Sequence, residues 1–448
     1  MLRFIRSLVV AGLWMTLVNT SIECATRPHF SIHYVSDFSA LGDGNADDGP
    51  AIERAILATN KSGGGEVRLP CGDFHIAHAV GNAPGSRSLL YVRHVHNVKL
   101  TGLGRCTHLF SLVPQKSVLE FEDSDGIIVS NLRISAVNAI YVETYGMGGG
   151  SAIRFSGVKN GSITNVEVDG AAAGAIYLTK GTSDSLVSNN YIHDTYGSGI
   201  WEDDCGSMNA HDCAPASPPL NNVYRKNTLV NTSLSMTTAI VTDNGGASTH
   251  TRIEGNSISW SRAPLDGYEQ VHCIQVGHAA DVSVVKNQCI GTPYDAIVVT
   301  TGNGTSSRRI TIQRNIVRQT GSSKYGGTGI VVYGDPTGGE ISEFTIEHNI
   351  VAIAKTDGIR LVSAGERGSV HDGRVEHNVI SMPDQLAPGT RFGIDVEHCV
   401  KVEVVANRIS CGSRCVAAGI NIVDLAGNIP GSGSNRISKI TGPELRIQ

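Results

Sequence analysis

The chain has 448 residues, of which 40% are hydrophobic and 17% are charged, and its formal net charge at pH 7 is −5. This is ample apolar material for a large core. The negative balance and the lack of a basic run argue against nucleic acid as a partner, whereas calcium or a neutral glycan fits the composition.

The first segment predicts a secretory signal peptide. Arg3 and Arg6 precede the apolar run Leu8–Val18, which is too short to cross a bilayer but has the length of a signal sequence. We expect cleavage between residues 20 and 27, which assigns residues 1–25 to the signal peptide. No later apolar segment has the length of a membrane span, so the predicted location is secreted, either extracellular or periplasmic, without a membrane partner.

The next segment predicts a tight glycine turn, a short helix and a strand. It contains the motifs Asp37–Gly44 and Asp47-Asp48, with Pro50 in the first helical turn, and the helix is expected to reach about Thr59. Gly63-Gly64-Gly65 and Val67–Pro70 follow. Together these motifs resemble the N-terminal segment of pectate-lyase-like and rhamnogalacturonase-like β-helix proteins. The resemblance implies a right-handed parallel β-helix in which the short N-terminal α-helix covers the open end of the solenoid.

An internal repeat runs through the rest of the chain, with spacings between 25 and 37 residues. Its first mark is an Asn followed two residues later by an apolar residue, at Asn131, Asn165, Asn190, Asn227, Asn256, Asn287, Asn315, Asn349, Asn378, Asn407 and Asn435. Its second mark is Ile after a small residue, at Ile176, Ile200, Ile240, Ile274, Ile297, Ile330, Ile359, Ile394 and Ile420.

Short alternating strands at this period bury a face only when they are stacked as coils. Asn tolerates the left-handed backbone region at a bend, and stacked Asn amides can hydrogen-bond along the coil axis. The sequence therefore predicts an all-β fold, a right-handed single-stranded parallel β-helix with a short N-terminal capping helix, and one domain over residues 26–448.

Ten cysteines fit an oxidising compartment. Bridge candidates by proximity are Cys205/Cys213, Cys273/Cys289 and Cys411/Cys415. No Cys-x-x-Cys pair or zinc-type Cys/His spacing occurs, so no structural metal cluster is expected.

If each Ile faces inward, the residues one and three beyond it face outward and stack across neighbouring coils. The third and fourth places after each Ile give Thr179 and Lys180, Asp203 and Asp204, Asp243 and Asn244, Gly277 and His278, and Thr300 and Thr301. Three carboxylates and a histidine thus fall on three consecutive coils. Ordinary strand ends or a calcium site would also explain them, because Asp is common at strand ends.

The chemical interpretation is acid/base cleavage of a glycosidic bond by Asp203, Asp204, Asp243 and His278. Crowded carboxyls raise the pKa of at least one of them, which stays protonated as the acid while another activates water. His278 would tune or relay that proton. Predicted substrate contacts are Trp201, as a stacking face for a sugar or as a cover for Tyr177, together with Asn244, Gln275 and Lys180.

The motif Glu202-Asp203-Asp204-Cys205 resembles the Gln-Asp-Asp-Cys segment of polygalacturonases. This resemblance implies that Asp203 and Asp204 are the acid/base carboxylates. The match is local, because the third Asp and the Gly-His-Gly and Arg-Ile-Lys elements of that family are missing here.

Two further features flank this column. The insertion Gly206–Leu220, which Cys205 and Cys213 would close, predicts a lid, a specificity loop or a plain surface excursion. A second polar cluster at the start of the same strands is the alternative site, with substrate contacts from Glu269, His272 and Asp295 and neighbours Asp194, Tyr196 and Asp266. Asp357, Glu397 and His398 are expected at a solvated rim.

The leading functional hypothesis is a secreted polysaccharide hydrolase that requires no cofactor. A lyase or uronate C5-epimerase is the first alternative, in which the Asp residues hold Ca²⁺ and His278 or Lys180 is the base. A non-catalytic glycan-binding solenoid is the second.

Overall fold

The computed structural model describes the chain over residues 30–81, 88–140, 150–203, 218–236, 238–302, 304–321, 326–352, 354–364, 369–382, 392–411, 418–423, 429–430, 434–438 and 445–447. The predicted signal peptide, residues 1–25, lies outside these ranges.

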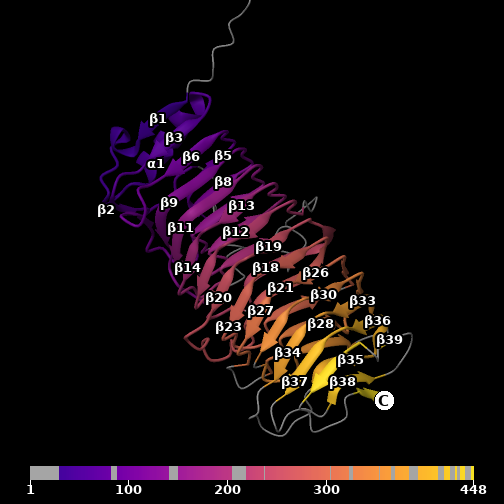
Figure 1. Ribbon diagram of the computed structural model, residues 1–448. Helices are drawn as coiled ribbons and strands as arrows, with labels where there is room; N and C mark the ends of the chain where they lie inside the picture. The colour runs from indigo at the N-terminus through magenta and orange to yellow at the C-terminus, as the bar shows by residue number, and fades with distance from the viewer. Residues whose placement is uncertain are drawn as a thin grey trace, which may run out of the picture.

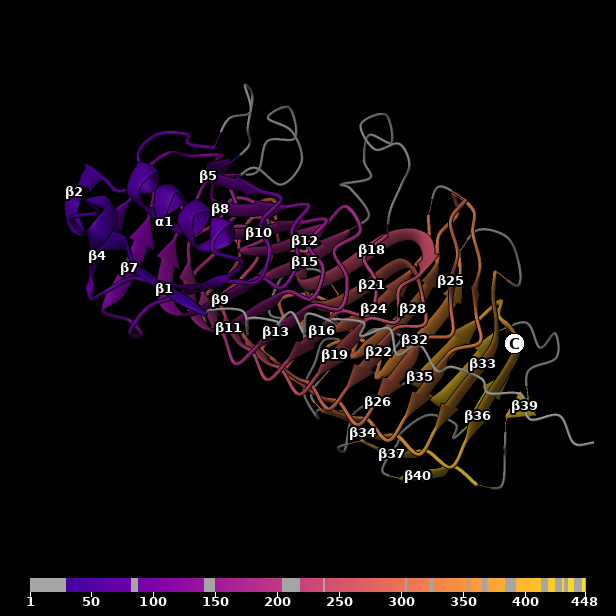
Figure 2. The same cartoon turned by 90° about the horizontal axis from the view of Figure 1, so that it is seen from above.

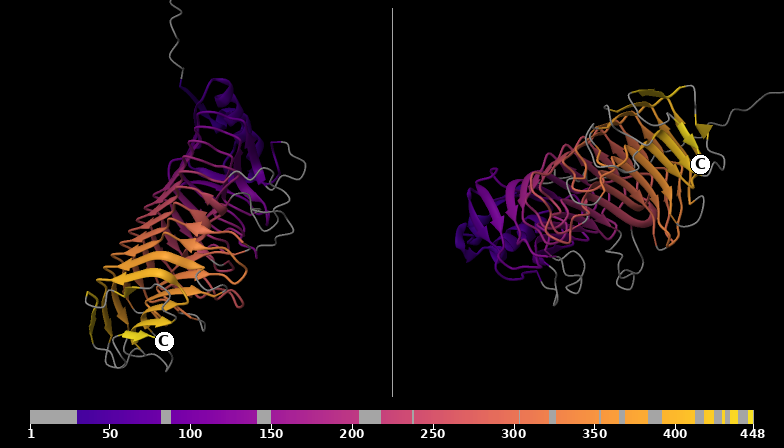
Figure 3. Two further views of the ribbon diagram at one scale, coloured as in Figure 1. Left: turned by 90° about the vertical axis from the view of Figure 1, so that its right-hand side faces the viewer. Right: turned by 90° about the horizontal axis from the view of Figure 1, so that it is seen from below.

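The strands wind into a right-handed parallel β-helix, as predicted, whose coils stack along one long axis from the N-terminal to the C-terminal end (Figures 1 and 3). Each full coil contributes one strand to each of three parallel sheets.

Sheet 1 consists of β5 (Ser88–Arg93), β8 (Ser117–Glu122), β10 (Ile153–Ser156), β12 (Ile176–Thr179), β15 (Ile200–Asp203), β18 (Thr238–Ser248), β21 (His272–Ala280), β24 (Ile297–Thr300), β28 (Ile330–Gly334), β32 (Ile359–Ser363), β35 (Phe392–Glu397), β38 (Ala418–Val423) and β41 (Leu445–Ile447). Sheet 2 consists of β1 (Ser31–Tyr34), β3 (Gly65–Arg68), β6 (Val98–Thr101), β13 (Leu186–Ser188), β16 (Val223–Arg225), β19 (Arg252–Glu254), β22 (Ser283–Val285), β26 (Thr311–Gln313), β30 (Thr345–Glu347), β33 (Val370–Glu376), β36 (Val400–Val405) and β39 (Ile429–Pro430).

Sheet 3 consists of β2 (Asp43–Asp47), β4 (Gly72–His75), β7 (Thr107–Phe110), β14 (Tyr191–His193), β17 (Thr228–Val230), β20 (Ser257–Ser259), β23 (Gln288–Ile290), β27 (Ile316–Arg318), β31 (Ile350–Ala352), β34 (Val379–Met382), β37 (Arg408–Cys411) and β40 (Arg436–Ser438). The longer strands β9 (Ile128–Ser135) and β11 (Ser162–Asp169) run through sheets 2 and 3, and the short strands β25 (Ser307–Arg308) and β29 (Ile341–Ser342) lie between sheets 1 and 2.

The repeated Ile residues form one row inside the helix. Successive members pair in register from Ile176 to Ile420, and none is more than 2% exposed. The inward assignment of this row is therefore confirmed, and it fixes which side chains of sheet 1 face outward.

The repeated Asn residues from Asn190 onward form a buried ladder between sheets 2 and 3. Asn287 is typical: its Oδ1 accepts hydrogen bonds from the backbone N–H and the amide of Asn256, and its Nδ2 donates to Asn315 Oδ1 and to the Ile253 carbonyl. The predicted amide stacking along the axis is confirmed. The predicted reason for the bend holds only at Asn131 and Asn165, whose φ is 55°, because in later coils the residue before the Asn adopts positive φ.

The N-terminal end carries a 3₁₀ turn, η1 (Val35–Phe38), and a helix, α1 (Gly49–Lys61) (Figure 2). The apolar face of α1, including Ile52 and Ile56, is buried in the main core. Asp48 stands at the N-cap, but its carboxylate accepts hydrogen bonds from the backbone N–H groups of Leu41 and Gly42 rather than from the helix.

Two disulfides join described residues, Cys273–Cys289 and Cys71–Cys106. The first was predicted from sequence proximity and the second was not, because its cysteines are 35 residues apart. Cys205/Cys213 and Cys411/Cys415 include residues outside the described ranges.

Candidate functional site

The outer face of sheet 1 carries two rows of side chains that run parallel to the axis, with about 4.8 Å between coils. The row directly after the buried Ile contains Tyr177, Trp201, Val241, Gln275, Val298, Val331, Arg360, Asp395 and Asn421. The row two residues further along each strand contains Thr179, Asp203, Asp243, Gly277, Thr300, Tyr333, Val362, Glu397 and Val423.

The first of two clusters of polar and ionisable side chains on this face consists of Tyr177, Thr179, Asp203, Asp243 and His278. We call it the Asp203 cluster. The carboxyl of Asp203 accepts hydrogen bonds from the Tyr177 hydroxyl at 2.7 and 2.8 Å and from the Thr179 hydroxyl at 3.0 Å. Asp203 is 1% exposed although it lies on the outward side of its strand. Burial raises the pKa of Asp203 to about 7, and the neighbouring Asp243 adds to this shift.

Asp243 lies opposite Asp203 in register on the next coil. Its Oδ1 is 2.7 Å from His278 Nδ1, and both side chains are partly exposed. The hydrogen bond to Asp243 raises the pKa of His278, which favours the imidazolium near neutral pH. Three predicted catalytic residues thus lie together on three successive coils, and their catalytic role stays a prediction.

The other residues predicted beside this cluster have different positions. Asp204 and most of the insertion Gly206–Leu220 lie outside the described residues, and so does the side chain of Asn244. Trp201 packs against the ring of Tyr177 at a centroid distance of 5.0 Å, which matches its predicted alternative role as a cover. Lys180 Nζ lies 3.1 Å from Glu122 Oε1, toward the N-terminal coils and away from Asp243.

The second cluster of ionisable side chains lines an open pocket of about 520 Å³ further along the same face. We call it the Arg360 pocket. Its wall includes Arg360 and five carboxyl or imidazole side chains: His272, Asp295, Asp357, Asp395 and Glu397. Arg360 Nη2 donates to both carboxylate oxygens of Glu397, at 3.2 and 3.1 Å, and Arg360 Nε lies 3.5 Å from Asp395 Oδ2.

Burial dominates the electrostatics of this pocket. It raises the pKa of Asp295 and of Asp357 to about 6 each. It also raises the pKa of Asp395 to about 8, helped by a hydrogen bond to Glu397, and lowers that of His272 to about 4. The pocket therefore holds a neutral carboxyl beside ionised ones at neutral pH, which is an arrangement suited to proton transfer or to binding hydroxyl groups.

The alternative site predicted at the strand starts is only partly assembled. His272 and Asp295 lie side by side, with His272 Nδ1 3.2 Å from the Asp295 carbonyl oxygen, and both line the Arg360 pocket together with Gln275. Asp266 and Glu269 lie in the segment that leads into β21 and do not line the pocket.

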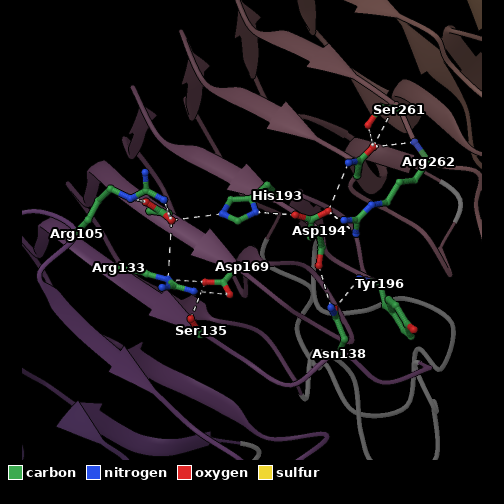
Figure 4. A network of polar contacts seen from close by, with 12 residues as sticks. Arg105, Arg133, Ser135, Asn138, Asp169, His193, Asp194, Tyr196, Ser261 and Arg262 are labelled. Carbon is green, nitrogen blue, oxygen red and sulfur yellow. Dashed lines mark hydrogen bonds and ion pairs between the residues drawn. The ribbon is translucent and has the colours of Figure 1, made fainter. Parts of the chain in front are cut away.

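Asp194 and Tyr196 belong instead to a polar network on sheet 3 and its neighbouring turns (Figure 4). The Asp194 carboxylate contacts His193 Nδ1 at 2.9 Å and Arg262 Nη1 at 2.9 Å. The backbone N–H of Tyr196 donates to Asn138 Oδ1. These two residues do not line the Arg360 pocket, and their grouping with His272 stays a prediction.

The expectation of a solvated rim is confirmed for His398, which is exposed, and for Glu397, which is partly exposed, but it was wrong for Asp357. Asp357 is 6% exposed and accepts a hydrogen bond from the Phe392 backbone N–H, and both Asp357 and Glu397 line the pocket. Arg360 and Asp395 were missed. The signal for them was present, because they directly follow Ile359 and Ile394 and so continue the outward row past the coils where carboxylates were sought.

Within the described ranges, no three His, Cys, Asp or Glu side chains gather closely enough to hold a metal ion. None of the helices in the same part of the chain has the length and apolar character needed to traverse a bilayer.

Comparisons with known proteins support the fold. No family model matches the chain. Over 79 residues, 18% of this chain, it is 39% identical to alginate lyase 7 of Azotobacter vinelandii, and over 64 residues, 14% of this chain, it is 44% identical to the mannuronan C5-epimerase AlgE1 of the same organism. The matched segments span only 9% and 4% of these relatives' lengths.

Solved structures match nearly the whole chain. The A-module of the A. vinelandii mannuronan C-5 epimerase AlgE4 has a TM-score of 0.57 at 16% identity, covering 93% of this chain and 97% of that one. The Streptococcus pneumoniae surface adhesin PfbA has a TM-score of 0.54 at 18% identity, covering 93% and 91%. A GH87 α-1,3-glucanase of Streptomyces thermodiastaticus has a TM-score of 0.51 at 18% identity, covering 92% and 68%. These likenesses show a parallel β-helix fold that enzymes and an adhesin share.

Proposed function

We propose that the protein is a secreted polysaccharide-active enzyme that hydrolyses a glycosidic bond at the Asp203 cluster. The observation that carries this proposal is the placement of Asp203, Asp243 and His278 on three successive coils of one outer face. The two disulfides fit an exported protein. The local identity to polysaccharide-modifying enzymes supports a polysaccharide as the substrate.

In the proposed mechanism, Asp203 is the general acid. Its pKa of about 7 keeps it protonated in mildly acidic solution, and the Tyr177 and Thr179 hydroxyls fix its orientation. It donates its proton to the glycosidic oxygen while the bond from that oxygen to the anomeric carbon breaks. Because Asp203 is only 1% exposed in the free protein, the proposed mechanism requires that substrate binding make its carboxyl accessible.

Asp243 is the general base. It takes a proton from a water molecule whose oxygen forms the new bond to the anomeric carbon, and it releases that proton to solvent after the turnover. His278 donates a hydrogen bond from Nδ1 that orients the Asp243 carboxylate. After one turnover Asp203 is ionised and regains a proton from solvent. No step involves a metal ion.

Hydrolysis with inversion at the anomeric carbon is the expected stereochemistry. Asp203 accepts hydrogen bonds from residues of the preceding coil, whereas Asp243 bonds to His278 on the following coil, and these opposite partners are the reason to expect a wide separation of the two carboxyls. Inverting enzymes separate their carboxyls by about 6.5–9.5 Å and retaining enzymes by about 5–5.5 Å. Proton NMR of the first-formed reducing end measures the outcome, and an anomer with the configuration of the substrate would contradict it.

The activity test is a panel of neutral and uronate-containing polysaccharides, incubated with wild type and with Asp243→Asn, with and without chelator. We expect new reducing ends without ultraviolet absorbance, no effect of chelator, and a loss of at least about a hundredfold in the variant. Binding of a glycan without any product would overturn the enzymatic proposal.

Uronate C5-epimerisation or β-elimination is the second candidate, favoured by the local identity to epimerases and a lyase. His278, in its neutral form at a pH above its raised pKa, would then remove the C5 proton, oriented by Asp243. Calcium would neutralise the uronate carboxylate in this chemistry, and the described residues offer no set of ligands for it. An unsaturated, ultraviolet-absorbing product or a changed uronate composition without new ends would replace hydrolysis with this candidate.

A further inference from the structure

The Arg360 pocket lies on the same outer face as the Asp203 cluster, on the coils that follow it. Strand β21 carries His278 near its end and Gln275 in the outward row, and Gln275 already lines the pocket. The pocket then extends over β24, β28, β32 and β35. Asp295, just before β24, and Asp357, just before β32, lie two and four coils beyond Asp243, about 10 and 20 Å along the axis, so a chain of sugars lying along this face would reach them. Its volume lies within the range of ligand-binding pockets.

The walls of the pocket suit a sugar ring. Val298 and Val331 form an apolar strip in the outward row, and Tyr294 and Tyr333 add aromatic surface beside it. Such surfaces pack against the apolar face of a pyranose, while polar groups at the edge bind its hydroxyls.

Carboxyl groups outnumber cations in the pocket, although burial keeps Asp395 mainly neutral at pH 7. Four carboxyl side chains line it against one guanidinium, and both carboxylate oxygens of Glu397 already accept hydrogen bonds from Arg360. Asp295 and Asp357 accept hydrogen bonds from backbone N–H groups through one oxygen each, of Thr328 and of Phe392. Oxygens of these two carboxylates are thus positioned to accept bonds from donors on a ligand.

We propose that the Arg360 pocket is a specificity subsite that binds a sugar residue lacking a carboxylate through its hydroxyl groups and rejects a uronate. The proposal rests on the proposed function, because it assigns part of the polysaccharide that the Asp203 cluster cleaves. A hydroxyl donates to Asp295 and Asp357, whereas a uronate would bring a further negative charge next to them, and the positive charge of Arg360 is already paired with Glu397.

The ionisation of the pocket gives this selectivity a pH dependence. Burial raises the pKa of Asp295 and Asp357 to about 6, so both are mainly ionised at pH 7 and neutral at pH 5. Discrimination against a uronate is therefore strongest at neutral pH and weakens as the pH falls through about 6.

The test compares mannan and mannuronan oligosaccharides of equal length and linkage, which differ at C6 alone, by calorimetric titration in an Asp243→Asn background that prevents turnover. At pH 7 we expect the neutral oligosaccharide to bind at least about tenfold more tightly. The double substitution Asp295→Asn/Asp357→Asn, which keeps the acceptors for Thr328 and Phe392, should reduce that ratio at least about fivefold. Glu340→Gln/Glu343→Gln, which removes two charges from exposed positions outside the pocket, should leave it unchanged.

Equal affinity for the two oligosaccharides, or a ratio that the pocket variant leaves unchanged, would overturn the subsite. This outcome is distinct from failure of the proposed function, because binding is measured without turnover. A protein that selects the neutral oligosaccharide but produces no reducing ends from any polysaccharide retains the subsite and loses the hydrolase.

Discussion

Asp203→Asn is expected to abolish turnover and, at pH 8, to stabilise the folded protein. The acid proton is lost with the carboxyl, whereas the asparagine oxygen still accepts from Tyr177. Because burial raises the folded-state pKa of Asp203 from 3.8 to about 7, the wild type loses stability as the pH rises between these values and regains none above them. The variant escapes this loss, so its advantage grows from zero near pH 4 to as much as about 4 kcal/mol at pH 8.

Denaturant unfolding at pH 4, 6 and 8 checks the stability, and a reducing-end assay checks turnover. Asp184→Asn is the matched control, since Asp184 is exposed on the coil before Asp203, and it should change neither quantity. An Asp203→Asn protein that is less stable than wild type at every pH, or that keeps its activity, would show that Asp203 is an ordinary structural carboxylate.

Asn287→Ala is expected to destabilise the protein by about 3–6 kcal/mol. The substitution removes four hydrogen bonds of the buried ladder and leaves polar groups of Asn256, Asn315 and Ile253 without them. Each buried group left unsatisfied costs about 1–3 kcal/mol. The midpoint of urea unfolding measures the loss.

Gln288→Ala is the control for this prediction, because Gln288 is the exposed neighbour at the start of β23 and the substitution keeps its backbone hydrogen bond to Asn256. It should change stability by less than about 0.5 kcal/mol. Similar effects of the two substitutions would mean that the Asn repeat is an ordinary bend signal rather than a source of stability.

Most of the fold could be predicted from the sequence, because a parallel β-helix is specified by local repeats. Each coil must bury one row of side chains and bend at the same places, so Ile176 and its successors, and Asn190 and its successors, mark the register directly. The Asn backbone conformation was misassigned, because the left-handed residue precedes the ladder Asn and varies among Lys, Arg, His, Gly, Asn and Ala. A position without a constant residue type leaves no pattern to detect.

The site was predictable as far as the outward rows were followed. Asp203, Asp243 and His278 came from counting positions after each Ile, and the structure brings them together. Arg360 and Asp395 follow the same count but stand on later coils, where Asp357 and Glu397 suggested only solvent exposure. Burial of a carboxylate depends on the side chains of neighbouring coils, which are about 30 residues away, so no local pattern reports it.

The most direct test of the account is a double-mutant cycle in kcat/KM with Asp203→Asn, Asp243→Asn and the combined variant. If the two carboxyls act on one glycosidic bond, either single substitution should remove nearly all of the activity, and the double variant should be little worse than the singles. Retained activity in both single variants, or losses that multiply in the double variant, would contradict the claim that these residues form one acid/base centre.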